Sequence, residues 1–143
     1  MAKHLIDSDL YIDLIQTGGT PPVIRELYER EAPGIYFSSV VAQELLAGAR
    51  TRFGKRAVET LLAPFEKARR MVTPSHREWR ETGAVMAEIL KRRRDLKHKL
   101  PALVNDCLLA LSARAIGASL YTRNRDDFVM IRQVRPFSLM IVG

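Results

Sequence analysis

The chain has 143 residues, which is enough for one domain with a hydrophobic core and too few for two domains of ordinary size. Apolar residues make up 47% of it and charged residues 27%, as in folded soluble proteins, and no apolar run approaches the ~18 residues that cross a bilayer. The first residues lack the long apolar segment of a secretory signal, and Cys107 is the one cysteine. We therefore expect no membrane insertion, no disulfide within the chain and a cytoplasmic location.

Basic residues outnumber acidic ones by 23 to 16, and the net charge of +7 favours a polyanionic partner. The excess is concentrated in three segments, 50–56, 67–70 and 91–99. Each segment taken alone is equally consistent with a solvated helix face. Three such segments in one small domain favour contact with an anion, and the densest group is Arg92, Arg93 and Arg94.

Short apolar strands alternate with helices along the whole chain. In chain order we predict a strand at 5–6, a helix at 21–30, a strand at 35–37, helices at 40–49 and 55–68, a strand at 71–73, helices at 78–94 and 101–115, a strand at 118–121, a short helix at 126–131 and a strand at 139–142. Pro101 suits the first turn of its helix and Gly117 suits the end. This alternation predicts a three-layer α/β/α sandwich with a central, mainly parallel sheet, formed as one domain over residues 1–143.

Two carboxylates, Asp7 and Asp9, follow the first strand directly. One interpretation is that this segment begins a helix, with Ser8 and Asp9 capping its free backbone N–H groups. The other is that Asp7 lies at a ligand site, because α/β folds bind ligands beyond the carboxyl ends of their strands. The segment from Thr122 to Asp127 follows a later strand and is predicted to lie at the same edge of the sheet.

Glu44 and Asp106 occupy unusual positions in two predicted helices. The residues three and four positions away from each of them are aliphatic or glycine, so both carboxylates face an apolar stripe. An unpaired ionised carboxylate is costly to bury, so each is expected to be paired with a base, protonated or bound to a metal. Arg114 is a candidate for an ordinary ion pair with one of them.

Acids at a strand end and on two separate helices fit one shared cation better than several separate ion pairs. Oxygen ligands without a histidine or cysteine cluster favour a hard ion such as Mg²⁺ or Mn²⁺. His4, His76 and His98 have no common spacing and are predicted to be packing or surface residues.

Four short motifs occur in order and cover nearly the whole chain: Asp7-Ser8-Asp9 after a strand, Glu44-Leu45 leading to Gly48, Asn105-Asp106 opening an apolar helix, and the segment from Tyr121 to Phe128 after a strand. In this order they resemble the PIN-domain ribonucleases, most closely the VapC-like toxins of bacterial and archaeal toxin–antitoxin pairs. Each motif alone is weak, and the ordered set is fairly specific.

The resemblance implies a metal site with Asp7, Glu44 and Asp106 as ligands, completed by the segment from Thr122 to Asp127. Some relatives carry an acid where this chain has Asn124, so the fourth ligand is Asn124, Asp127 or a water held by either. An asparagine followed three residues later by an acid is also typical of helix capping. A second departure is Asp9, at a position where relatives often have asparagine or serine.

The resemblance further implies an endoribonuclease that uses Mg²⁺ or Mn²⁺ to hydrolyse RNA phosphodiesters, with Asp7, Glu44, Asp106 and Asp127 as its catalytic acids. Thr122 and the cluster formed by Arg92, Arg93 and Arg94 are expected to bind the RNA. The expected partners are an antitoxin that covers the acidic pocket and a second copy in a homodimer. The alternatives are a non-enzymatic basic module that binds nucleic acid or protein, and a phosphoacceptor receiver-like domain, which fits less well because no lysine follows a late strand.

Overall fold

The structure of the protein, a computed structural model, describes residues 1–143. Its strands are β1 (Lys3–Ile6), β2 (Phe37–Ser38), β3 (Met71–Val72), β4 (Ala118–Thr122) and β5 (Ser138–Ile141). Its helices are α1 (Ser8–Thr17), α2 (Pro22–Arg30), α3 (Ser39–Gly48), α4 (Arg52–Lys67), α5 (His76–Arg92), α6 (Leu100–Ile116) and α7 (Arg125–Val134), with 3-10 turns η1 (Ala32–Gly34) and η2 (Arg94–Lys99). Every predicted strand and helix is present in the predicted order.

The strands are short and parallel. β4 lies between β1 and β5 in one sheet, and β2 pairs with β3 in a second. An isolated parallel bridge between His4 and Ile35 places β2 beside β1, so the strands run in the order β3, β2, β1, β4, β5 across the molecule. Parallel strands end at a common edge, and the residues that follow β1 and β4 therefore meet.

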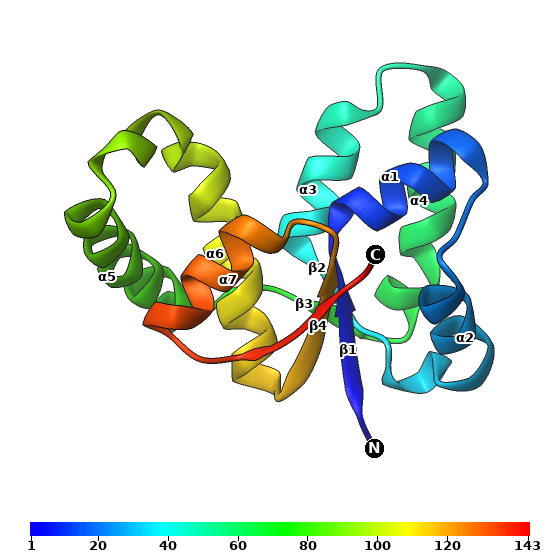
Figure 1. The fold of residues 1–143 in the computed structure, drawn as a ribbon. Coiled ribbons are helices and arrows are strands. Elements are labelled where there is room, and N and C mark those ends of the chain that lie inside the picture. The colour runs from blue at the N-terminus through cyan, green and yellow to red at the C-terminus, as the bar shows by residue number, and fades with distance from the viewer.

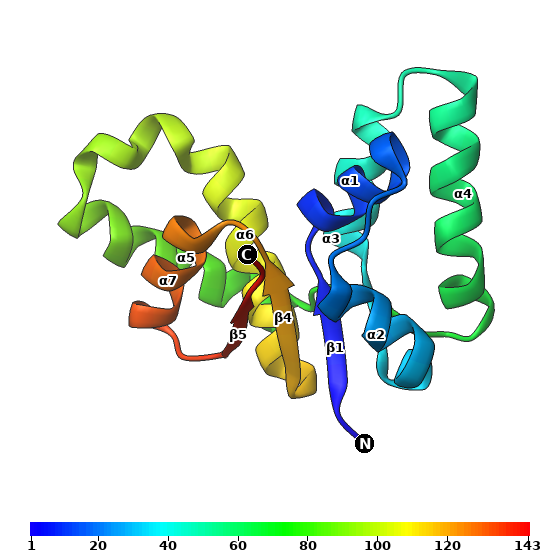
Figure 2. The same cartoon turned by 45° about the vertical axis from the view of Figure 1, so that its right-hand side comes forward.

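Helices cover the strands on both sides. Figures 1 and 2 show α1 to α4 gathered on one side of β1 and β4, and α5, α6 and α7 on the other. The core between these layers includes Leu5, Leu120, Leu103 and Leu109, none more than 1% exposed. The predicted three-layer α/β/α sandwich is confirmed. No helix is both long and apolar enough to span a membrane.

Local signals set most helix ends. The side chain of Ser38 accepts from Val40 N–H at the start of α3, and Thr51 accepts from Gly54 N–H at the start of α4, three residues before the predicted start. Gly117 ends α6 in the left-handed region at φ 70°, which glycine adopts without a steric penalty. The helix α5 ends at Arg92, two residues before the predicted end, and residues 94–99 form η2 around the buried Leu96.

Candidate active site

The edge of the sheet beyond β1 and β4 carries the first acid of the site. The Asp7 backbone N–H donates to the Tyr121 carbonyl at 2.9 Å, which extends the pairing of the two strands by one residue. The Asp7 carboxylate accepts from Ser8 N–H and from the Thr122 hydroxyl, both at 2.7 Å. Asp7 is therefore itself the N-cap of α1, and the expectation that Ser8 and Asp9 cap this helix is wrong.

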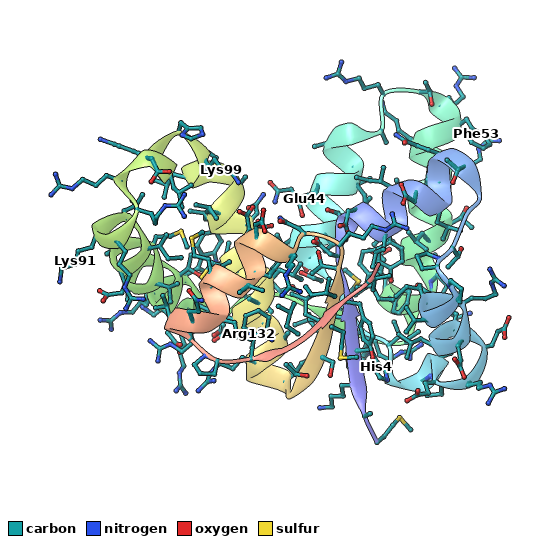
Figure 3. The ribbon with its side chains drawn as sticks, in the orientation of Figure 1. His4, Glu44, Phe53, Lys91, Lys99 and Arg132 are labelled. Carbon is teal, nitrogen blue, oxygen red and sulfur yellow. The ribbon has the colours of Figure 1, made fainter.

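Glu44 and Asp106 approach Asp7 from α3 and α6, and neither of the two belongs to an ion pair. Arg114, the basic partner considered from the sequence, donates instead to the Pro136 carbonyl. Figure 3 shows Glu44 on α3 and Lys99 at the end of η2 projecting from opposite sides of the same region. The two acids are thus held among other acids without a base of their own.

Burial and mutual repulsion raise the pKa values of these acids. Burial, with the charges of Asp9 and Glu44, raises the pKa of Asp7 to about 7, although the hydrogen bonds from Thr122 and Ser8 oppose the shift. Burial, with the charges of Asp7, Asp127 and Glu44, raises the pKa of Asp106 to about 8. Burial and Asp9 also raise the pKa of Glu44. A nearby cation would remove these penalties.

Asn124 and Asp127 lie beside Asp106 on the loop and first turn that follow β4. The Asn124 side-chain Nδ2 donates to Asp127 at 3.1 Å and to Asp106 at 3.4 Å, while its Oδ1 accepts from the Asp127 N–H. An amide nitrogen does not coordinate a cation, so in this arrangement Asn124 orients the two carboxylates and caps α7. The capping interpretation is therefore confirmed, and the role of Asn124 as a metal ligand stays a prediction.

Lys99 is a site residue that the sequence did not reveal. Its ammonium lies 3.0 Å from the Asp127 carboxylate, and this is the one ion pair that reaches the acid cluster. Burial would raise the pKa of Asp127, but hydrogen bonds from Asn124 and Lys99 outweigh it and hold the pKa below its ordinary value. Lys99 is separated from Asp127 by 28 residues, and no local pattern marks the pair.

Asp9 also lies at the site, where the sequence suggested only a helix cap. One oxygen accepts from Arg123 N–H at 3.0 Å, and the other, Oδ1, is buried without a hydrogen-bond partner. Its charge raises the pKa of both Asp7 and Glu44. One indication of this role was present in the sequence, because relatives often carry an uncharged residue where this chain has Asp9.

Thr122 is fully buried, and its hydroxyl donates to Asp7 and accepts from Asn124 N–H at 3.0 Å. It therefore contacts the acids rather than the surface.

The donor set of the site fits a hard divalent cation. All its candidate ligand atoms are carboxylate oxygens, the type that Mg²⁺ and Mn²⁺ prefer. The repulsion among the acids also favours a bound cation. So does the buried Asp9 Oδ1, which has no hydrogen-bond partner. No three carboxylate, histidine or cysteine side chains are arranged in this structure to hold a metal ion, so the fit concerns the chemistry of the donors.

The three arginines of the predicted cluster do not all border the same cavity. Arg92 and Arg93 line a cavity of about 530 Å³ that also reaches Lys99 and Asp127, whereas Arg94 does not line it. Arg92 lies 3.5 Å from Glu88, and Arg93 makes two hydrogen bonds to Asp95. A part of the cluster therefore borders the acid site.

A larger and mainly apolar cavity of about 760 Å³ lies between α1, α2 and α4. A neighbouring cavity of about 480 Å³ between α1, α3 and α4 includes Glu44 in its lining. Phe53 lines both cavities and is 76% exposed. An apolar surface thus leads to one of the site acids.

A model of the PIN-domain family matches residues 5–133. The chain belongs to the PIN-domain family. PIN domains are nucleases, so membership places this chain among the hydrolases of nucleic acid and excludes the receiver-like alternative. No match was found among the curated proteins.

Solved structures with the same fold include two VapBC structures with bound DNA. This PIN domain superposes on VapBC2 from Rickettsia felis, bound to a promoter DNA fragment, with a TM-score of 0.71 and 18% identity over 98% of both chains. It superposes on DNA-bound VapBC from Salmonella typhimurium with a TM-score of 0.71 and 22% identity, over 99% of this chain and 98% of that one. It superposes on VapBC-1 from nontypeable Haemophilus influenzae with a TM-score of 0.68 and 21% sequence identity, over 96% of both chains.

Proposed function

We propose that this PIN domain is an endoribonuclease that requires Mg²⁺ or Mn²⁺ and acts as the toxin of a toxin–antitoxin pair. The observation that supports the proposal is the mutual repulsion of Asp7, Glu44 and Asp106, which come from three different parts of the fold and have no basic partner. Such a group of acids is unstable alone and is relieved by a cation.

In this proposal Asp7, Glu44 and Asp106 hold the cation. When bound, it supplies a nucleophilic water at neutral pH and offsets charge on the phosphate oxygens. Thr122 keeps Asp7 in place through its 2.7 Å hydrogen bond and acts by orientation, because it is too buried to reach RNA. Asn124 does the same for Asp106 and Asp127 through Nδ2, and Asp127 completes the acid set.

Water attacks the phosphorus in line with the leaving oxygen, and the bond from phosphorus to that oxygen breaks. No covalent intermediate with the enzyme is needed. Lys99, 3.0 Å from Asp127, is placed to balance negative charge as the RNA phosphate approaches the acids. Arg92, Arg93 and Arg94 attract the backbone, which positions RNA without reading its sequence.

The deciding experiment is a cleavage assay with single-stranded RNA and with DNA of the same sequence, each in Mg²⁺, in Mn²⁺ and in excess chelator. We expect RNA to be cut in either metal and to stay intact in chelator. Equal cleavage in chelator would contradict the metal requirement, and preferential cleavage of DNA would contradict the RNA assignment. Metal-independent RNA binding without cleavage in any arm would favour the non-enzymatic alternative.

We further propose an antitoxin partner that binds over the apolar cavities beside Phe53 and reaches the acid site at Glu44. The mainly apolar lining and the exposed phenyl ring support a partner segment with apolar side chains. A solved structure with the same fold, at a TM-score of 0.53 and 24% identity, is named a toxin–antitoxin complex from Klebsiella pneumoniae, which supports a partner of this class. A homodimer and a cytoplasmic location complete the proposal, and light scattering of the purified chain tests the homodimer.

A further inference from the structure

The cavity between α5, η2 and α7 is distinct from the apolar cavities and carries charge on its rim. Its volume is about 530 Å³, within the size range of sites for small organic ligands. Four basic side chains line it, together with two acids and the Gln133 amide. The basic residues are Arg92, Arg93, Lys99 and Arg125.

These basic side chains are not equally free. Arg93 uses one edge of its guanidinium, Nε and Nη2, on Asp95, and Arg92 lies within 3.5 Å of Glu88. Arg125 is exposed and takes part in none of the ion pairs of the chain. Arg125 is therefore the guanidinium most available to an anion on the rim.

The floor of the cavity is apolar. It consists of side chains from α5, η2 and α7, namely Ile89, Leu96, Val129, Met130 and Val134. A flat, largely apolar group with an attached anion matches a floor and rim of this kind. A nucleobase with its phosphate has this character, and unstacked bases of single-stranded RNA also stack on arginine guanidinium planes.

The cavity shares a wall with the acid site. Asp127 lines it and is also hydrogen-bonded through Asn124 to Asp106. Lys99 lines it and binds Asp127 at 3.0 Å. A nucleotide in the cavity would thus lie next to the phosphodiester held at the acids.

We propose that this cavity is a nucleotide subsite for the RNA substrate. It holds the base of a nucleotide beside the cleaved bond on the apolar floor, with its phosphate at Arg125 and the base edge at the Gln133 amide. The proposal rests on the proposed ribonuclease function and adds the element that selects where the RNA is cut. It also predicts a single-stranded substrate, because a paired base cannot enter.

The first test measures binding of a fluorescent single-stranded RNA to the full chain in chelator at several salt concentrations. Arg125→Gln should reduce the slope of log affinity against log salt by about 0.7, the value for one phosphate contact on a single strand. The matched control is Arg132→Gln, the same charge change on an exposed residue of α7 that does not line the cavity. Figure 3 shows Arg132 on this helix, and its variant should keep the wild-type slope.

The second test measures cleavage kinetics. Gln133→Glu places a carboxylate on the rim at an exposed position, and it should raise KM about tenfold with little change in kcat. An abasic nucleotide moved along a cleaved RNA should weaken wild-type cleavage at one position next to the cut bond. The same abasic position should have little effect in Gln133→Glu, because the base contact is already lost.

The outcomes separate this inference from the proposed function. Suppose that the wild type cuts RNA, that both arginine variants keep the wild-type salt slope, and that no abasic position weakens cleavage. The subsite is then wrong and the ribonuclease stands. If Arg125→Gln alone lowers the salt slope but no RNA is cut, nucleotide binding by the cavity stands, whereas the ribonuclease and the role of the cavity beside a cut bond are both wrong. A free nucleoside monophosphate that competes as strongly as RNA would make the cavity a mononucleotide site and overturn the inference.

Discussion

Acids in this site differ in charge state because their immediate partners differ. Asp106 has other acids around it, and burial with their charges raises its pKa to about 8. Asp127 touches Lys99 and Asn124, and these contacts outweigh burial and lower its pKa. Without a cation, Asp106 therefore keeps its proton to a higher pH than Asp127 does.

Asp106→Asn should reduce RNA cleavage by about a hundredfold or more, since even the outer partners of metal ligands contribute 10- to 100-fold. The change keeps the shape of the side chain, so the circular dichroism spectrum should match the wild type. Glu59→Gln removes one charge from an exposed position on α4 and serves as the control. Near-normal cleavage by Asp106→Asn would remove this residue from the site.

Thr122→Val should lower cleavage by about 10- to 100-fold, because Asp7 loses the hydrogen bond that orients it. Thr122→Ser keeps the hydroxyl and should retain most of the activity. The two variants are compared by kcat and by the Mg²⁺ concentration needed for half-maximal rate. If valine and serine behave alike, the hydroxyl does not orient Asp7 in the active protein.

At the scale of elements, the ends of helices and strands carry the site. Asp7 follows β1 and caps α1, and Asn124 follows β4 and caps α7. Each of these residues satisfies backbone N–H groups and contacts the acid cluster at the same time. Substitution at either position therefore affects stability and site geometry together, and the variants must be chosen to separate the two effects.

Asn124→Ala should lower the free energy of unfolding by about 1 kcal/mol through loss of the cap, which corresponds to about 4 °C in melting temperature. Asn124→Asp keeps a capping oxygen but adds a charge beside Asp106 and Asp127. Its melting temperature in chelator should also fall, and Mg²⁺ should raise it by more than in the wild type. Thermal melts with and without Mg²⁺ measure both effects, and an unchanged Asn124→Ala melt would contradict the capping role.

For the whole molecule, the acids couple folding to pH and to metal. The pKa values of Asp7 and Asp106 are raised from 3.8 to about 7 and about 8, so the folded chain binds more protons than the unfolded chain across this range. The stability that these protonated acids contribute is complete below pH 3.8 and is lost as pH rises through about 7 and 8. Asp127, whose pKa is lowered, acts in the opposite direction at acidic pH.

The metal-free wild type should therefore melt at a lower temperature at about pH 9 than at about pH 5, and Asp7→Asn should show a smaller difference. Asparagine also caps helices well, so this variant keeps the start of α1. Mg²⁺ at a hundred times its dissociation constant should stabilise the wild type by about 2.7 kcal/mol and Asp7→Asn by less. A variant that is less stable in chelator and keeps the full Mg²⁺ shift would contradict the role of Asp7.

The partner surface is tested by two exposed aromatic residues on opposite sides of the molecule. Phe53 is 76% exposed beside the apolar cavities, and Trp79 is 55% exposed on α5. When the chain is co-expressed with an antitoxin that binds it, Phe53→Ser should weaken the complex at least tenfold, since one large aromatic anchor contributes about 2 kcal/mol or more. Trp79→Ser should leave it intact in size-exclusion chromatography. A complex lost with Trp79→Ser alone would move the interface to α5.

The sequence alone determined the order of the predicted elements and the layered fold, and it singled out the three acids that we predict to share one site. These depend on local physics: the periods of apolar residues, the capping residues Ser38 and Gly117, and the cost of an acid such as Glu44 in an apolar stripe. The observed ends of elements differ from the predicted ends by up to three residues. One reason is that a capping residue such as Thr51 begins a helix before its apolar periodicity becomes visible in the sequence. The elements were predictable because each forms from contacts between near neighbours in the chain.

Only the tertiary structure decided which side chains meet at the site and in which charge state. Thr122 binds Asp7 across 115 residues, and Lys99 binds Asp127 across 28. Neither pair follows a spacing rule, because each depends on the order of the strands and on where η2 packs against α7. The pKa values depend in turn on burial and on these neighbours, which exist only after the chain has folded.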